Sequence, residues 1–421
     1  MNRKIMIKDI CNVYDGPHAT PKRTEKGPVY LGVKAISEEG TLLPDEFTFL
    51  SEEDFKKWTK RVTPLENDIV FSYEATLNRY AIIPKGFYGC LGRRLAVIRA
   101  KSNEVNINWL YYYFRSPEWR TFIANHIICG STVNRISIDD FPFYPISLPE
   151  RTVQDKTAAI LMNIDRKILL NNKINAELEN LAKTLYNYWF VQFDFPNDKG
   201  KPYRASGGKM EYSEVLKREI PKGWRVDKLN KTDICSIISS GINEFEGEKV
   251  YLSTSDVDGT EIINHTIKTD YHNRLSRANM QPQLNSVWFA KMKDTVKHIL
   301  VNNGAEILVT DYIFSTGFAG LQCKEHTLYY LWNYLCSDIF EKRKNLVATG
   351  ATQQAINDDD LKGFTILIPP DQLLKKFSDI VSPYYHLISR VKFENKEMVE
   401  LRDFLLPLLM NGQVRVKDDT N

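Results

Sequence analysis

The chain has 421 residues, which is too long for one compact core and long enough for two ordinary domains. It is 43% hydrophobic and 26% charged, and this balance excludes disordered, collagen-like and disulfide-stapled miniprotein classes. The 56 Lys and Arg residues stand against 53 Asp and Glu residues, so the net charge of +3 neither supports nor excludes a nucleic-acid partner.

The cysteines and the hydropathy pattern indicate a compartment. The six cysteines are widely scattered, without a C-x-x-C pair or a His at zinc-ligand spacing, so a structural zinc site is not predicted. The sequence has no run of 18 or more apolar residues, and its N-terminus has no uninterrupted apolar segment. We therefore predict a protein of the reducing cytoplasm that does not span a membrane.

An internal repeat is the most informative feature of the sequence. Gly130-Ser131-Thr132 recurs as Gly350-Ala351-Thr352, and the same offset of 220 continues downstream, for example from Pro149 to Pro369. A period of this size makes each copy a whole domain with its own core. Tandem duplication in turn predicts pseudo-twofold geometry.

In chain order, each copy begins with short β-like runs. Val29–Val33, Asp68–Phe71 and Val287–Ala290 are rich in β-branched and aromatic residues, and Gly and Pro separate such runs. A shorter helix is then predicted in each copy, over Asn108–Ile128 and over Thr327–Val347.

Each copy ends in a long helical pattern. From Arg151 to about Val191, apolar residues settle into the alternating spacing of three and four that is typical of a coiled coil, and the same stripe recurs 220 residues later. A helix of some 40 residues spans roughly 60 Å, so each long helix is expected to pair with the other. Asn175 and Asn395 lie at equivalent positions, where a buried Asn commonly fixes register; the alternative is two solvated Asn residues.

These patterns predict an α+β protein in which two tandem α/β domains are separated by a pair of long antiparallel coiled-coil helices, as a pseudo-twofold dumbbell. The predicted boundaries are 1–150 for the first domain, 151–196 for the first long helix, 197–370 for a polar linker and the second domain, and 371–421 for the second long helix and tail. The helix length would then act as a molecular ruler.

Catalytic signatures are missing from the sequence. It contains no G-x-x-x-x-G-K-[ST], H-E-x-x-H or G-x-S-x-G motif, and no Asn-Pro-Pro-Tyr motif of the kind that amino-methyltransferases use. We therefore predict that the chain is not an enzyme.

Basic and polar residues in the loops of both copies are candidate DNA contacts. Lys and Arg can neutralise phosphates, Arg can read guanine, and Asn and Gln can pair with adenine. The alternatives are a solvated basic face and ordinary helix-to-strand turns. The candidates are Lys22, Arg23, Ser72, Arg79, Arg93, Arg94, Thr132, Asn134, Arg135, Lys268, Arg274, Arg277, Lys291, Lys293, Lys297, Thr352, Gln353 and Gln354.

Over nearly its whole length the sequence resembles the specificity subunit of a type I restriction-modification system. The segments that carry the resemblance are Asn171–Glu179, Ala182–Phe195, Glu219–Trp224 and Leu405–Gly412. One departure is that the chain opens almost directly on Ile7-Lys8-Asp9-Ile10, without the Ile-Pro-x-Gly-Trp motif of residues 220–224.

The resemblance implies a DNA reader that is not catalytic. Two target recognition domains would each bind one half of a split double-stranded DNA sequence, and the helical regions would dock two methyltransferase subunits that use S-adenosylmethionine to methylate adenine. Added restriction subunits would use ATP and Mg²⁺ to translocate and cut the DNA. None of these cofactors is expected to bind this chain directly.

Docking residues are expected where aromatics crowd one end of the first long helix, because aromatics are enriched at interfaces. The candidates are Tyr186, Tyr188, Trp189, Phe190, Phe193, Phe195, Leu406 and Leu408. Two other functions stay open at this point. They are a stand-alone DNA-binding regulator with two reading heads and a coiled-coil scaffold whose globular ends bind proteins.

Overall fold

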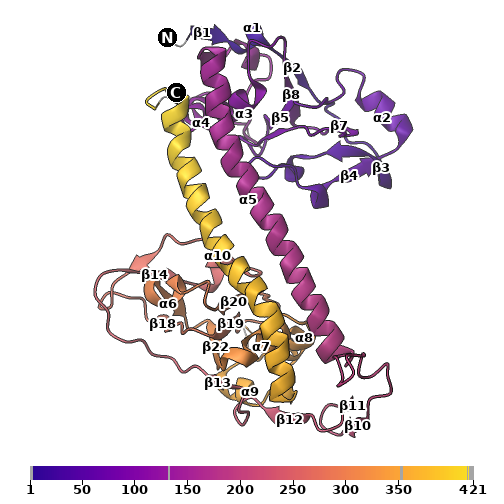
Figure 1. The fold of residues 1–421 in the computed structure, drawn as a ribbon. Coiled ribbons are helices and arrows are strands. Elements are labelled where there is room, and N and C mark those ends of the chain that lie inside the picture. Colours follow the sequence, from indigo (N-terminus) through magenta and orange to yellow (C-terminus); the bar gives the residue numbers. More distant parts are fainter. Residues whose placement is uncertain (1–2, 131–132, 351–353, 415, 417–421) are drawn as a thin grey trace, which may run out of the picture. The chain divides into compact units, whose positions relative to one another are not determined.

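The computed structural model describes residues 3–130, 133–350, 354–414 and 416 (Figure 1). The chain divides into two compact units: unit 1 contains residues 1–168 and 397–421, and unit 2 contains residues 169–396. Each unit holds one globular domain and a part of both long helices, which are α5 (Arg151–Tyr186) and α10 (Asp371–Met410). The predicted α+β class and the two predicted long helices are confirmed.

Domain 1, the globular part of unit 1, contains strands β1 (Arg3–Met6), β2 (Cys11–Asp15), β3 (Arg23–Leu31), β4 (Thr48–Leu50), β5 (Ile69–Ser72), β6 (Tyr80–Ile82), β7 (Gly89–Leu91), β8 (Leu95–Ala100) and β9 (Pro145–Leu148). Its helices are α1 (Ile7–Ile10), α2 (Glu52–Trp58), α3 (Ile107–Arg115) and α4 (Pro117–Ala124). The strands form sheets of order β2-β8-β5-β6, β4-β3-β7 and β1-β9. Every residue of β5 is buried, which fits its run of Ile, Val and Phe.

Domain 2, the globular part of unit 2, follows the same plan. Its strands are β12 (Arg225–Lys228), β13 (Cys235–Ile237), β14 (Lys249–Leu252), β15 (Val257–Asp258), β16 (Glu261–Ile262), β17 (Lys268–Thr269), β18 (Ala278–Met280), β19 (Ser286–Ala290), β20 (His298–Val301), β21 (Tyr312–Ser315), β22 (Phe318–Cys323) and β23 (Thr365–Ile368). Its helices are α6 (Ile307–Asp311), α7 (Leu328–Leu335), α8 (Asp338–Val347) and α9 (Asp358–Lys362). The two largest sheets have the orders β13-β22-β19-β20 and β17-β14-β21-β18.

The internal repeat is also visible in the way the strands of the two domains pair. Ile69 of β5 pairs with Ile82 of β6, and Val287 of β19 pairs in the same antiparallel way with Leu300 of β20. The parallel pairs also correspond, because β3 pairs with β7 in domain 1 and β14 pairs with β21 in domain 2. The two domains are therefore structural copies of one another, as the sequence predicts.

The single helix predicted before each loop is two helices. In domain 1, α3 ends at Arg115. The hydroxyl of the next residue, Ser116, accepts a hydrogen bond from the Trp119 N–H and so starts α4, with Pro117 in its first turn. In domain 2, Ser337 caps α8 through the Phe340 N–H. A Ser that is free to bond the next turn favours a new helix start over continuation.

The segment predicted as a polar linker is folded. Phe195 stacks on Tyr203 with ring centroids 4.6 Å apart and on Trp224 at 5.3 Å. A Cβ atom at Gly208 would lie 2.3 Å from the Tyr203 ring, so only Gly fits there. Strands β10 (Met210–Ser213) and β11 (Arg218–Pro221) form a hairpin next to this cluster. The aromatic side chains order a segment whose composition alone is typical of linkers.

In unit 2 the long helices pair in antiparallel fashion (Figure 1). Nδ2 of Asn171 donates to Oδ1 of Asn395 at 2.7 Å, and further along, Glu179 of α5 lies 3.5 Å from Lys392 of α10. Residue numbers rise along one helix as they fall along the other. Of the two predicted register residues, Asn175 is buried and Asn395 is half-buried, so neither is a solvated surface residue. The partner of Asn395 is the buried Asn171, whereas Oδ1 of Asn175 has no hydrogen-bond partner among the described residues.

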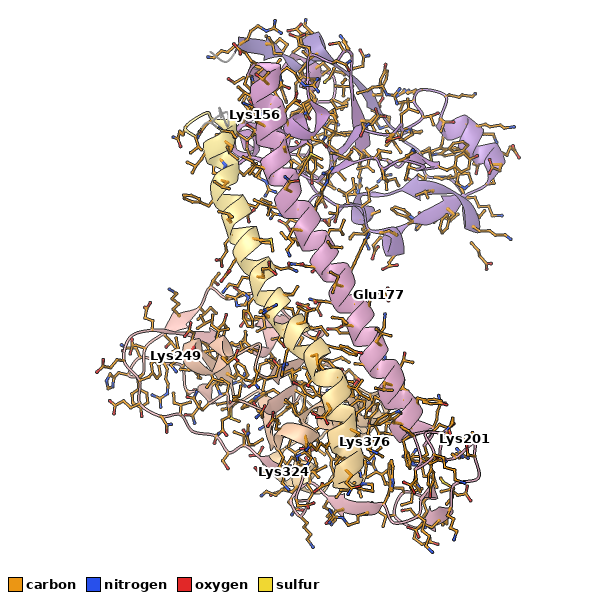
Figure 2. All side chains as sticks on the ribbon, in the orientation of Figure 1. Lys156, Glu177, Lys201, Lys249, Lys324 and Lys376 are labelled. Atoms are coloured by element: carbon orange, nitrogen blue, oxygen red, sulfur yellow. The ribbon has the colours of Figure 1, made fainter. Side chains whose placement is uncertain are left out.

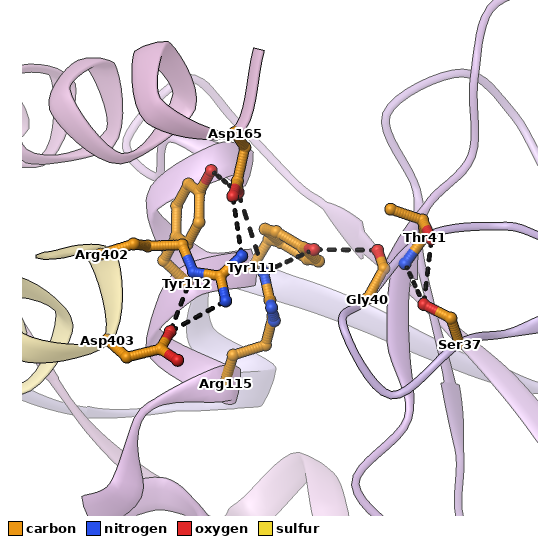
Figure 3. A network of polar contacts seen from close by, with 9 residues as sticks. All are labelled: Ser37, Gly40, Thr41, Tyr111, Tyr112, Arg115, Asp165, Arg402 and Asp403. Atoms are coloured by element: carbon orange, nitrogen blue, oxygen red, sulfur yellow. Dashed lines mark hydrogen bonds and ion pairs between the residues drawn. The ribbon is translucent and has the colours of Figure 1, made fainter. Parts of the chain in front are cut away.

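In unit 1 a polar network ties both long helices to domain 1 (Figure 3). Asp165 of α5 accepts a hydrogen bond from the Tyr112 hydroxyl of α3 at 2.6 Å and one from Arg402 of α10 at 3.0 Å. Arg115 of α3 lies 3.9 Å from the same carboxylate. Burial alone would lower the pKa of Arg402, but the hydrogen bond and charge of Asp165 outweigh it and raise that pKa.

Candidate nucleic-acid interface

The tip of a β-hairpin meets a polar loop in domain 1. The hairpin is formed by β5 and β6, and its tip lies against the loop that joins α4 to β9. The Ala75 N–H donates to the Asn134 carbonyl at 2.9 Å, and the Ile136 N–H donates to the Tyr73 carbonyl at 2.9 Å. We call the contact of residues 72–80 with the described loop residues 128–130 and 133–136 junction 1.

Domain 2 builds the same contact from its own hairpin, formed by β19 and β20. The Lys293 N–H donates to the Gln354 carbonyl at 2.9 Å, and the Ile356 N–H donates to the Lys291 carbonyl at 3.0 Å. We call the contact of residues 290–298 with the described loop residues 349, 350 and 354–356 junction 2. Each backbone bond of one junction has its counterpart in the other, so the repeated polar loop is held at a hairpin tip in both domains.

The hairpin tips contain strained backbone. Ala75 and Asn78 at junction 1 have φ of 67° and 61°, and Asp294 at junction 2 has φ of 54°. A left-handed conformation costs a non-glycine residue about 1 to 2 kcal/mol and persists only where the surroundings fix it. Such strain is found most often at binding sites, which makes the tips candidates for contact with a ligand.

Exposed polar side chains surround junction 1. Asn134 and Arg135 are exposed on the loop, and Arg93 is exposed on the turn between β7 and β8. The neighbouring Arg94 is half-buried, and its Nε donates to the Glu74 carboxylate of the hairpin tip at 2.9 Å. The structure thus brings these four candidates to one hairpin tip, and their role in DNA binding stays a prediction.

The other candidates of domain 1 have different surroundings. Ser72 is buried, and its hydroxyl accepts a hydrogen bond from the Arg79 N–H inside the hairpin, while the Arg79 guanidinium donates to the Ile36 carbonyl at 3.2 Å. Lys22 and Arg23 are exposed at the start of β3. Thr132 lies outside the described residues.

At junction 2 the candidates contact one another and their neighbours. Nζ of Lys293 donates to Oε1 of Gln354 at 2.7 Å, and Nζ of Lys291 pairs with Asp358 at 2.9 Å. Lys297 donates to a backbone carbonyl at 2.7 Å. Thr352 and Gln353 lie outside the described residues.

Three further candidates lie outside junction 2. Lys268 and Arg277 are exposed. The Arg274 guanidinium lies 4.3 Å above the centre of the Tyr271 ring, which holds it by a cation–π contact.

Sequence reasoning missed four residues that lie at the hairpin tips or bond them. They are Tyr73, Glu74, Asp294 and Asn345, whose side chain accepts a hydrogen bond from the Asp294 N–H. Glu74 and Asp294 are acidic, and a search for basic groups passes over them. Tyr73 is buried, and its hydroxyl has no hydrogen-bond partner among the described residues. Burial, together with nearby carboxylates, raises the pKa of Tyr73 to about 12, so this phenol keeps its proton at neutral pH.

Most of the predicted docking residues are core residues in the described chain. Tyr186, Trp189, Phe190, Phe193 and Phe195 are buried in the main core of unit 2. Tyr188 is 39% exposed in the π-helical turn Asn187–Val191 that ends the first long helix. In unit 1, Leu406 is buried and Leu408 is half-buried.

An exposed apolar stripe lies instead along the part of α5 in unit 2. Leu170, Ile174 and Leu181 are 55%, 39% and 55% exposed, and spacings of four and seven residues place them with Tyr188 on one helical face. Glu177, labelled in Figure 2, lies on this face between Ile174 and Leu181.

Neither a metal centre nor a membrane span is found in the part of the chain that the structure describes. Within it, no three His, Cys, Asp or Glu residues are placed to share a metal ion. Likewise, none of its helices has the length and apolar character to cross a bilayer.

Comparisons with known proteins agree on one family. The model of the type I restriction modification DNA specificity domain matches residues 2–180 and again residues 221–401. The chain is 25% identical to the type I restriction enzyme MjaIX specificity subunit of Methanocaldococcus jannaschii, over 88% of this chain and 82% of that protein. It is 22% identical to the HindI specificity subunit of Haemophilus influenzae, over 98% and 92% of the two chains.

The fold agrees as well. The crystal structure of the type I restriction-modification system S subunit from M. genitalium superposes with a TM-score of 0.56, at 15% identity, and covers 97% of this chain and 96% of that one. The two matches of the family model coincide with the two copies of the internal repeat. The chain therefore belongs to the type I restriction modification DNA specificity family, whose members are specificity subunits and not catalytic ones.

Proposed function

We propose that junction 1 and junction 2 each read one half of a bipartite double-stranded DNA target. The observation that carries this proposal is the recurrence of the same hairpin-to-loop contacts in both domains, with polar and basic side chains at each tip. A specificity subunit with two copies of one reader needs one equivalent reading site in each copy.

The side chains at the junctions have suitable chemistry. Asn134 can bond both N6 and N7 of adenine, and Arg135 can bond O6 and N7 of guanine, through the edges that these bases present in the major groove. Arg93 can neutralise a phosphate. At junction 2, Lys293 and Gln354 bond each other at 2.7 Å, so DNA would exchange this contact for contacts to bases or phosphates.

The long helices supply the remaining parts of the function. We propose that their length sets the spacer between the half-sites and that the exposed stripe of Leu170, Ile174, Leu181 and Tyr188 docks a methyltransferase subunit. Two such subunits would bring S-adenosylmethionine, and restriction subunits would bring ATP and Mg²⁺. This chain would bind none of these cofactors and would work with the genome in the cytoplasm.

The test is to express the chain with the methyltransferase encoded beside it and to map methylated adenines in the host genome. We expect a single bipartite motif with a fixed nonspecific spacer, and salt-sensitive binding of a duplex that carries it. A duplex with both half-sites scrambled is the control. Methylation at a continuous motif, or equal binding of the scrambled duplex, would contradict the proposal.

The same preparation separates this function from that of a stand-alone regulator. A regulator would bind its bipartite target with full affinity as the isolated chain. A specificity subunit is expected to bind tightly only after assembly with the methyltransferase subunits.

A further inference from the structure

In domain 2 the tip of the β19–β20 hairpin is bonded to helix α8 by Lys344 and Asn345. We propose that Lys344 and Asn345 of α8 are positioning residues, which hold the tip of the β19–β20 hairpin in the conformation that reads the second half-site. This inference rests on the proposed function of junction 2.

Asn345 bonds the strained residue of the tip twice. Its Nδ2 donates to Oδ1 of Asp294 at 2.9 Å, and its Oδ1 accepts from the Asp294 N–H at 3.0 Å. Asp294 is the residue with φ of 54°. Two bonds from one amide to both the side chain and the backbone fix the residue in this left-handed conformation.

Lys344 bonds the next residue of the tip from inside the protein. Its side chain is 0% exposed, Nζ donates to the Thr295 carbonyl at 2.7 Å, and Nζ forms an ion pair with Oε2 of Glu341 at 2.8 Å. The other oxygen of Glu341 lies 3.2 Å from Nε2 of the buried His298, at the start of β20. A buried ammonium group requires such partners, so the tip and the network stabilise each other.

The electrostatics of the network support a charged Glu341. Burial alone would raise the pKa of Glu341, but hydrogen bonds and charges from His298 and Lys344 outweigh burial and lower it. At neutral pH Glu341 is therefore a carboxylate, which pairs with His298 of β20 and with Lys344 of its own helix, α8.

The bonded tip residues adjoin the groups proposed to read DNA. Lys293 directly precedes Asp294, and its N–H and Nζ both bond Gln354 of the loop. A change in the backbone at Asp294 would therefore move Lys293 and loosen Gln354. The two α8 residues would act on DNA through the hairpin and would not touch it.

In domain 1 the corresponding contact between hairpin and helix is made by neutral groups. Tyr80 holds the register position of His298, because Tyr80 pairs with Phe71 as His298 pairs with Phe289. Its hydroxyl accepts from Nε1 of Trp119 in α4 at 2.8 Å. Asn125, which follows α4, is exposed. Substitutions in α8 should consequently affect the second half-site alone.

The experiment uses the chain assembled with its methyltransferase subunits and three variants. N345D places two carboxylates against each other at the tip, whereas D294N/N345D restores a donor and acceptor pair with the charge moved to the other residue. N125D makes the same chemical change at an exposed Asn that directly follows α4 of domain 1 and is the control. Binding is measured on duplex pools in which either the first or the second half-site is randomised.

We expect N345D to lose at least 10-fold of the discrimination in the second half-site and none in the first. D294N/N345D should regain most of it, and N125D should behave as the unchanged chain. Retained discrimination in N345D, equal loss in both half-sites, or no recovery in D294N/N345D would overturn the inference. Failure of the unchanged chain to discriminate either half-site would instead refute the proposed function.

Discussion

Asn171 of α5 and Asn395 of α10 share a hydrogen bond of 2.7 Å between the paired helices of unit 2. The second amide donor of Asn395 bonds Asn172 at 2.8 Å. Asn171 is buried and Asn395 is half-buried, and an amide pair of this kind favours one helix register, because another alignment would leave the buried Asn171 amide without its partner.

The first prediction concerns this pair. N395L leaves the buried Asn171 amide without a partner and should destabilise the chain by about 1 to 3 kcal/mol. N171L/N395L replaces both amides by apolar groups and should recover the loss, as packed hydrophobic residues often do for buried polar pairs. Urea unfolding followed by circular dichroism measures both. A double variant as unstable as N395L would show that the amides do not act as a pair.

The second prediction concerns Asp165, the shared acceptor of the network in unit 1. D165A leaves the buried Arg115 without a carboxylate and leaves the buried Arg402 with Asp403 alone, and we expect a loss of about 3 kcal/mol. Urea unfolding measures the effect. The matched control is E214A, which removes the carboxylate from the exposed pair of Lys217 and Glu214 and should leave the urea midpoint unchanged. Equal midpoints for D165A and the unchanged chain would show that the network contributes nothing to folding.

The sequence was sufficient for the architecture because the repeat and the helical stripe depend on residue spacing. The repeat appears in the structure as matching strand pairs and matching junctions. Spacing also predicted helical regions before each loop, but it could not show their division at Ser116 and Ser337, where one hydroxyl decides the outcome.

Individual roles were harder to predict because composition does not report burial. Phe190 and Phe193 look like interface aromatics in the sequence, yet both lie in the core of unit 2. The basic candidates were identified one by one, whereas the structure shows Arg94 bonded to Glu74 and Lys293 bonded to Gln354. Such partners are far apart in sequence, and only the fold brings them together.

The third prediction separates base reading from phosphate contact at junction 1. N134A should cost about 1 to 3 kcal/mol on the correct sequence and relax discrimination at one base pair of the first half-site. R93A should weaken binding to all sequences and reduce the slope of log K against log salt by about 1. Fluorescence anisotropy at several salt concentrations measures both effects, with K217A as an exposed control. The assignment fails if R93A changes base preference and N134A does not.

The fourth prediction concerns pH and Glu341. Its folded-state pKa is lowered from an ordinary value of 4.5, so the charged carboxylate stabilises the fold above about pH 4.5. This stability is lost as pH falls through the lowered pKa. E341Q removes the titrating group, so its free energy of unfolding should fall less than that of the unchanged chain between about pH 5 and about pH 3. At pH 7 the variant should be the less stable of the two, because it lacks the charged carboxylate. Urea midpoints across this range give the two slopes, and parallel slopes would contradict the prediction.

The fifth prediction tests the helices as the determinant of the spacer. Removing residues 167–173 from α5 and 393–399 from α10 deletes one heptad from each helix, including the Asn171 and Asn395 pair, and preserves the heptad phase. The pair of Asp165 and Arg402 and the pair of Glu179 and Lys392 remain. Seven helical residues span about 10 Å, which corresponds to roughly three base pairs of DNA.

We expect the shortened chain to recognise the same two half-sites across a spacer shortened by about three base pairs, or to lose binding to the original target because no duplex satisfies both the new distance and the helical phase. Selection from duplexes that carry both half-sites with spacers of every length distinguishes these results. Deletion of the α5 heptad alone is the control, because it misaligns the antiparallel pair and should abolish binding to all spacers. An unchanged spacer preference in the doubly shortened chain would refute a role of helix length.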